Sequence, residues 1–100
     1  MKTYKFKGTK IYIEKLSYPN GRTALEFTNA KTGESHLTAT VNIPEQELLP
    51  EAICIKTWCG NEEVLAFLIA QGIISKTKYK FPVGAGLAIV HVVDLLMKDF

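Results

Sequence analysis

Apolar and polar residues alternate along the first 42 positions in the manner of antiparallel strands. Residues 10–18, 23–29 and 35–42 each place apolar side chains at every second position, which is the spacing of one face of a strand. Asn20 and Gly21 separate the first two runs, and Asn-Gly between apolar runs is a strong hairpin signal. The pattern therefore predicts a three-stranded meander with one apolar face.

The second half of the chain predicts one short helix over residues 61–71. Asn61 can accept a hydrogen bond from a free amide of the first turn, and Glu62 and Glu63 bring negative charge to the positive end of the helix dipole. Apolar residues then recur at helical spacing. Gly72 stands where a left-handed residue ends many helices.

The remaining segments read as strands and turns. Residues 3–7 predict a lysine-rich edge strand, residues 52–58 a buried strand, and residues 87–97 a final strand rich in β-branched residues. Residues 43–51 are bounded by prolines and predict a connection, and the glycines at 84–86 predict a bend.

Together these elements predict one α+β domain over residues 1–100. We expect a small antiparallel, curved sheet or incomplete barrel of about six strands, with the short helix packed on its open face. The predicted core consists of apolar residues at the inward positions of these elements: Ile11, Ile13, Leu25, Phe27, Leu37, Val41, Ile53, Ile55, Leu65, Leu68, Ile74, Ile89 and Val93.

The composition is that of a globular protein. Hydrophobic residues make up 47% and charged residues 22% of the 100 residues, which is too apolar for a disordered chain. No apolar run approaches the roughly 20 residues that span a bilayer, so we expect no membrane association and a cytoplasmic location. Two cysteines are too few for a disulfide framework.

Charge is distributed unevenly along the chain. Residues 1–22 hold six basic residues and one acidic residue, whereas residues 23–63 hold two basic and seven acidic residues. Lysines can neutralise phosphates while aromatic rings stack on unpaired bases. One hypothesis is therefore a small nucleic-acid-binding module that uses a basic and aromatic face: Lys5, Lys7, Lys10 and Tyr12, joined by Lys78 and Lys80.

The other hypothesis, which the sequence favours, is a protein that binds a protein partner without catalysing a reaction. Trp58 could present an aromatic surface, and Glu47 and Glu51 could present an acidic one, to a partner encoded by the host or by a mobile element. We expect no cofactor. The oligomeric state is left open by the sequence.

Cysteine and histidine offer two further kinds of chemistry. Cys54, Cys59, His36 and His91 are the only set that could form a tetrahedral metal site, but the cysteine spacing does not fit one, so no metal is expected. Cys59 stands just before the predicted helix, where its thiol could be activated. No acidic or amide residue that could orient a histidine ring is adjacent to either histidine in the sequence, so no catalytic residue is assigned.

Parts of the chain resemble a family of small uncharacterised accessory proteins of bacterial mobile elements and phages. The resemblance lies in residues 55–58, 60–65, 72–74 and 81–84, and it extends to residues 40–44. These are turn glycines and apolar positions around the strand, the helix and the final bend. The resemblance implies an accessory role in such an element, and that setting favours binding over metabolism.

Overall fold

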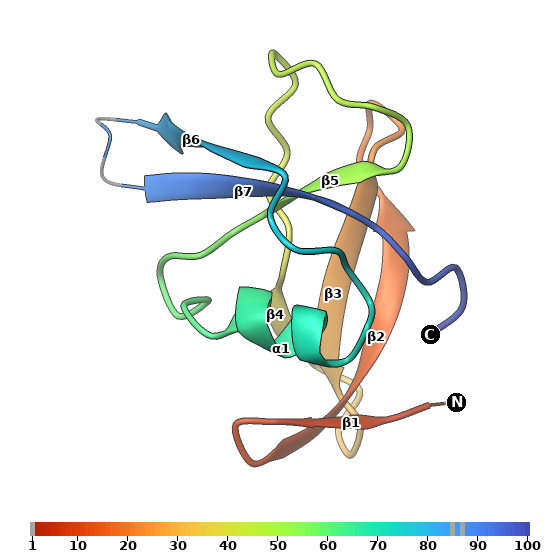
Figure 1. Ribbon diagram of the computed structural model, residues 1–100. Helices are drawn as coiled ribbons and strands as arrows, with labels where there is room; N and C mark the ends of the chain where they lie inside the picture. The colour runs from red at the N-terminus through yellow and green to blue at the C-terminus, as the bar shows by residue number, and fades with distance from the viewer. Residues whose placement is uncertain (1, 85, 87) are drawn as a thin grey trace.

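The computed structural model describes residues 2–84, 86 and 88–100, and within them the chain forms seven strands and one helix (Figure 1). The first antiparallel sheet is a meander in the order β1-β2-β3-β4, and the second has the order β5-β7-β6. The elements are β1 (Tyr4–Phe6), β2 (Thr9–Ser17), β3 (Thr23–Asn29), β4 (Ser35–Thr38), β5 (Ala52–Ile55), α1 (Val64–Ala70), β6 (Tyr79–Val83) and β7 (Ala88–Asp94). The predicted α+β class is confirmed, and neither sheet closes into a barrel.

The chain passes from the first sheet to the second at residues 39–41. The Ala39 amide still donates to Leu25 of β3, whereas the Val41 amide donates to Cys54 of β5. Thr40 forms an isolated bridge with Ile55. The predicted strand over residues 35–42 is therefore split between the two sheets. This corner turns the sheet surface and gives the fold its curvature.

The two hairpins of the first sheet use different turns. Lys7 and Gly8 connect β1 to β2 and both have positive φ, which is the backbone of a two-residue type I′ turn. The predicted Asn-Gly hairpin is present, but its loop has three residues. Gly21 alone adopts positive φ there, and the Tyr18 amide donates to the Arg22 carbonyl to close the loop.

The helix begins three residues later than predicted and ends at Ala70, one residue before the predicted end. Asn61 does not cap it, because the N-cap position is Glu63. The side-chain amide of Asn61 donates to the carbonyl of Thr38 at 2.6 Å. Residues 61–63 form a turn instead, and α1 begins at Val64. At the other end Gly72 has φ +72°, its amide donates to Ile69, and the Ile73 amide donates to Leu68. These two bonds form a Schellman motif.

The main core lies between the first sheet, α1 and one face of the second sheet. Its largest fully buried side chains include Phe27, Ile11, Leu25 and Ile55. The other face of the second sheet is also covered, because Cys54, Val90 and Val92 form a smaller cluster with Val41, Ile43, Leu48, Trp58 and Phe81. Burial on both faces explains the nearly continuous apolar run of β7.

Most predicted core residues are buried, and the exceptions follow from strand position. Leu37, Val41, Leu65 and Ile89 are only partly buried, since they lie on an edge strand, at the corner, at the rim of the helix or near the β6–β7 turn. The buried apolar residues outside the predicted list are Tyr4, Phe6, Ala24, Ala39, Cys54, Val64, Ile73, Val90 and Val92. Ala85 of the predicted glycine bend and Leu87 of the predicted last strand lie outside the described residues.

Candidate functional site

The candidate site lies on the outer face of the β1–β2 hairpin. Lys5 and Lys10 are direct register partners across these antiparallel strands, and both side chains are exposed. Directly opposite residues in such a pair have Cβ atoms about 4.5–5.5 Å apart and point to the same face. The hairpin therefore holds two ammonium groups on one small area of surface.

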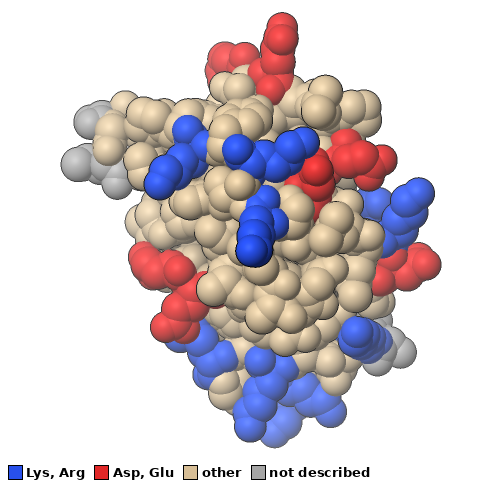
Figure 2. Space-filling model, in the orientation of Figure 1, with Lys and Arg blue, Asp and Glu red and all other residues tan. Residues whose placement is uncertain are grey.

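A third lysine reaches the same area from the turn between β3 and β4. The Ala30 amide donates to the Lys10 carbonyl at 2.9 Å, which holds the start of this turn against β2. Lys31 follows and lines an open pocket of about 500 Å³ with Thr3, Tyr4, Lys5, Gly8 and Lys10. We call Lys5, Lys10 and Lys31 the lysine site. Figure 2 shows basic side chains gathered at the end of the molecule where Figure 1 places β1.

The inner face of β1 holds the lysine site in position. Tyr4 and Phe6 are 6% and 3% exposed and point into the core. Their rings meet Phe67 of α1 edge to face at centroid distances of 6.2 and 5.0 Å, and Phe6 meets Phe27 in the same way. A three-residue edge strand is thus anchored by aromatic packing.

This burial excludes the two aromatic residues of β1 from any stacking on bases. Tyr4 and Phe6 belong to the core and have no face free for a base. Tyr12 remains on the outer face of β2, two residues from Lys10, and it is partly buried. In β1, Lys5 therefore lies on one face of the strand, and Tyr4 and Phe6 lie on the opposite face.

The lysine site has no acidic partner among the described residues. The two ion pairs found in that part of the chain are Lys7 with Glu63, at 3.8 Å, and Lys78 with Asp94, at 3.3 Å. Lys5, Lys10 and Lys31 take part in neither. Lys7 belongs to the same hairpin, and its ion pair is exposed and therefore weak.

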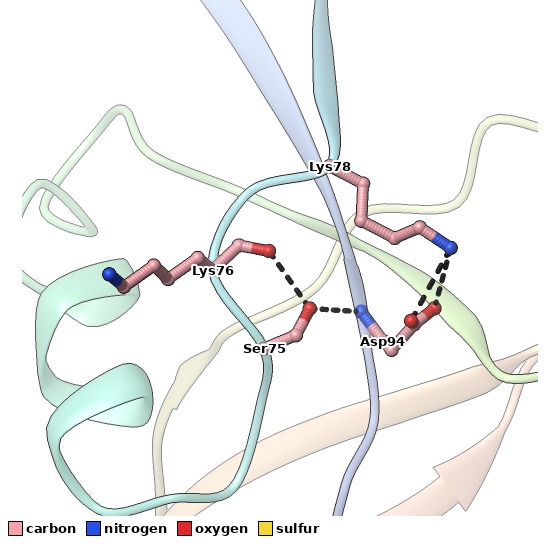
Figure 3. Close-up of polar contacts among 4 residues, drawn as sticks. All are labelled: Ser75, Lys76, Lys78 and Asp94. Atoms are coloured by element: carbon pink, nitrogen blue, oxygen red, sulfur yellow. Dashed lines mark hydrogen bonds and ion pairs between the residues drawn. The ribbon is translucent and has the colours of Figure 1, made fainter.

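Lys78 and Lys80 are not part of the lysine site. Lys80 lies in β6 and Lys78 just before it, in the second sheet and away from β1 (Figure 1). Lys78 contacts both carboxylate oxygens of Asp94, and Ser75 accepts a hydrogen bond from the Asp94 amide while donating to the Lys76 carbonyl (Figure 3). These contacts join the segment after α1 to β7.

The three residues predicted to bind a protein partner lie on both sides of β5 in the sequence. Glu51 precedes β5 and Trp58 follows it, so the strand separates them. Trp58 packs partly against the smaller core cluster, with the Lys56 ammonium 6.0 Å from its ring centroid. Glu47 is exposed in the connection before β5, and its carbonyl accepts a 3.4 Å hydrogen bond from the Tyr79 hydroxyl.

The connection carrying Glu47 has an exposed apolar residue that was not singled out from the sequence. Leu49 is 66% exposed. Two grooves of about 260 and 300 Å³ flank this segment, and both are lined by Thr23 and Pro50. The guanidinium of Arg22 fixes the connection by donating to the carbonyls of Ile43 and Gln46. Only the tertiary structure reveals this arrangement.

The cysteines and histidines lie in separate surroundings. Cys59 is exposed with φ +53°, and α1 begins five residues later, so its thiol does not stand at the helix N-terminus. Cys54 is buried, and burial raises the pKa of its thiol. His91 Nδ1 lies 2.9 Å from the Thr77 hydroxyl. Within the described ranges no three His, Cys, Asp or Glu side chains cluster as metal ligands would.

Comparisons with protein-family models, with curated proteins and with solved structures found no match. Of the helices described, none has the length and apolar character needed to cross a membrane.

Proposed function

We propose that this protein is a small accessory module that binds nucleic acid through the phosphate groups at the lysine site. The observation that carries the proposal is the register of Lys5 opposite Lys10. Like charges directly opposite one another on a strand pair are destabilising. An anion between them would replace this repulsion with two attractive contacts.

A second pair of like charges in the same sheet shows the contrast. Glu14 of β2 is the register partner of Glu26 of β3. Their carboxylates accept hydrogen bonds from the hydroxyls of Thr28, Ser35 and Thr38. The acidic pair is therefore satisfied within the protein. The lysine pair has no such compensation among the described residues, which supports an external ligand.

The proposal is tested by measuring the affinity for a short labelled DNA duplex between about 50 and 200 mM salt. We expect Lys5→Gln with Lys10→Gln to weaken binding by roughly tenfold or more at low salt. The slope of log affinity against log salt should fall by about two, one for each lost phosphate contact.

The matched control is Lys15→Gln with Lys98→Gln. It removes two positive charges from exposed positions beside a different groove. We expect its affinity to stay within about twofold of the unmodified protein, because charge beyond a Debye length is screened. Absence of binding at low salt, or equal losses in the two variants, would overturn the proposal.

The second candidate function is binding of a protein partner at the connection before β5, and exposed Leu49 is the observation that favours it. Glu45, Glu47 and Glu51 are exposed on the same connection. The partner segment that fits this surface has an apolar side chain beside basic residues. Such a segment could belong to a host protein or to one encoded by a mobile element.

A random peptide library selected on the immobilised protein tests this second candidate. We expect the enriched peptides to combine an apolar residue with flanking lysine or arginine, and to lose binding to a Leu49→Ser variant. Leu16→Ser is the control, since Leu16 is also exposed but lies outside the connection. Peptides that bind the two variants equally well would exclude this surface.

A further inference from the structure

The groups that surround the lysine site are suited to phosphates and lack the usual means of reading bases. Proteins that bind single strands stack successive bases on aromatic side chains. The two aromatic residues of β1 are buried against Phe67 on the opposite face of the strand. Tyr12 is the aromatic residue that shares the outer face with Lys10, and it is partly buried.

The described residues of the lysine site also include no arginine, the side chain most often used to recognise bases directly. The commonest specific contact is a bidentate one from arginine to guanine. The chain has one arginine, Arg22, and both ends of its guanidinium are used by the carbonyls of Ile43 and Gln46. Lysine ammonium groups on flexible stems act instead as point charges, and point charges recognise phosphate wherever it lies.

Charge density then decides between duplex and single strand. A duplex carries one negative charge per about 1.7 Å of its axis, twice the density of one strand. Lys5, Lys10 and Lys31 lie around one pocket, so together they can contact the phosphates of only a short stretch of nucleic-acid backbone. Without base stacking to compensate, the denser polyanion binds more tightly.

We infer that the lysine site is a sequence-independent receptor for the backbone of double-stranded nucleic acid. This inference rests on the proposed function and narrows it to a ligand class. Three phosphate contacts predict a slope of log affinity against log salt of about −2.7 on duplex DNA. Lys2, which precedes β1, and Lys7 of the β1–β2 turn are also exposed, and two further contacts from them would steepen the slope to about −4.5.

The test compares labelled DNA duplexes of three base compositions with single strands of the same length. We expect duplex affinities to agree within about threefold of each other and to exceed those of the single strands. Lys31→Gln should reduce the duplex slope by about one. Tyr12→Leu should change the affinity for either ligand by less than about twofold, since stacking is not used.

The outcomes separate the inference from the proposed function. Tighter binding to single strands, a strong dependence on base composition, or a large loss with Tyr12→Leu would overturn the inference and leave nucleic-acid binding intact. Absence of binding to every ligand would overturn both. Equal competition by polyglutamate would also overturn both, because it would assign the site to acidic polypeptides. Thermal melting of each variant checks that folding is unchanged.

Discussion

The guanidinium of Arg22 donates hydrogen bonds of 2.6 and 2.5 Å to the carbonyls of Ile43 and Gln46. The β2–β3 hairpin is thereby joined to a connection that has no strand or helix of its own. Planar guanidinium can span two carbonyls in a way that a single ammonium cannot. The half-buried Arg22 side chain is therefore the main polar anchor of this segment.

We expect Arg22→Lys to lower the free energy of unfolding by about 1.5–3 kcal/mol, because one of two hydrogen bonds from a charged donor is lost and such bonds contribute about that much each. Urea denaturation measures this loss. Hydrogen exchange should also become faster in residues 43–51 than elsewhere. Lys15→Arg serves as the control, because it exchanges the same two side-chain types at an exposed position. Unchanged exchange in this segment would show that Arg22 does not hold it.

We expect Tyr4→Phe to raise stability. The Tyr4 hydroxyl is buried without a hydrogen-bond partner among the described residues. Such a group costs about 1–3 kcal/mol, and removing its oxygen keeps the ring packed on Phe67. The melting temperature is the readout, and Tyr12→Phe is the control on the outer face of the same sheet. A destabilised Tyr4→Phe protein would mean that the hydroxyl has a partner.

We expect Gly72→Ala to destabilise the protein by about 1–2 kcal/mol, because Gly72 has φ +72° and a side chain there is strained. A Cβ at this position meets no atom within 4 Å, so the loss comes from the backbone alone. Gly72→Asn should lose less, since asparagine tolerates this conformation better. Equal stability of the alanine and asparagine variants in urea would argue against this account.

We expect stability to decrease as the pH falls below 6.5, in part through His91. Burial, and then the nearby Lys80 ammonium, lower the pKa of His91 from its usual 6.5. The unfolded chain therefore binds a proton at a higher pH than the folded one, and protonation favours unfolding. This contribution is fully present above 6.5 and is lost as the pH falls through the folded pKa.

An NMR titration of the histidine rings measures this shift directly. His91 should titrate below 6.5, and Lys80→Gln should move its pKa upward by removing the positive charge across the strand pair. The His91→Gln variant should lose part of the pH dependence of unfolding. Titration of His91 above 6.5 would contradict the prediction.

We expect the two cysteines to differ in reactivity. Cys59 is exposed, whereas Cys54 is buried with a raised pKa. A thiol reagent should modify one cysteine in the folded protein and the second only after unfolding. Cys59→Ser should abolish the fast reaction, and Cys54→Ser should leave it unchanged. Equal rates for both thiols in the folded protein would show that Cys54 is accessible.

Local patterns were sufficient to predict the meander and the end of the helix. Alternation in residues 23–29 predicted β3 with its bounds, and Gly72 marked the Schellman motif. The start of the helix depended on a long-range contact instead. Asparagine is a common N-cap residue, but the side-chain amide of Asn61 donates a hydrogen bond to the carbonyl of Thr38, 23 residues away. Tertiary structure overrode a local preference there.

The candidate site was predicted only in part. Because side chains alternate along a strand, the predicted strand over residues 3–7 has Lys5 on the face opposite Tyr4 and Phe6, a signal that the prediction of one basic and aromatic face did not use. The pairing of Lys5 with Lys10 depends on the register that the Lys7–Gly8 turn sets, and glycine in this turn was the signal that was not used. The position of Lys31 depends on the β3–β4 turn lying against β2, which no local pattern encodes.

The most direct test of the central claim is a map of amide chemical shifts as an unlabelled DNA duplex is added to isotope-labelled protein. The account predicts salt-sensitive shifts that cluster at Lys5, Lys10 and Lys31, with little change near Lys80 and Leu49. Shifts centred on Lys80 or Leu49, or none at low salt, would contradict it.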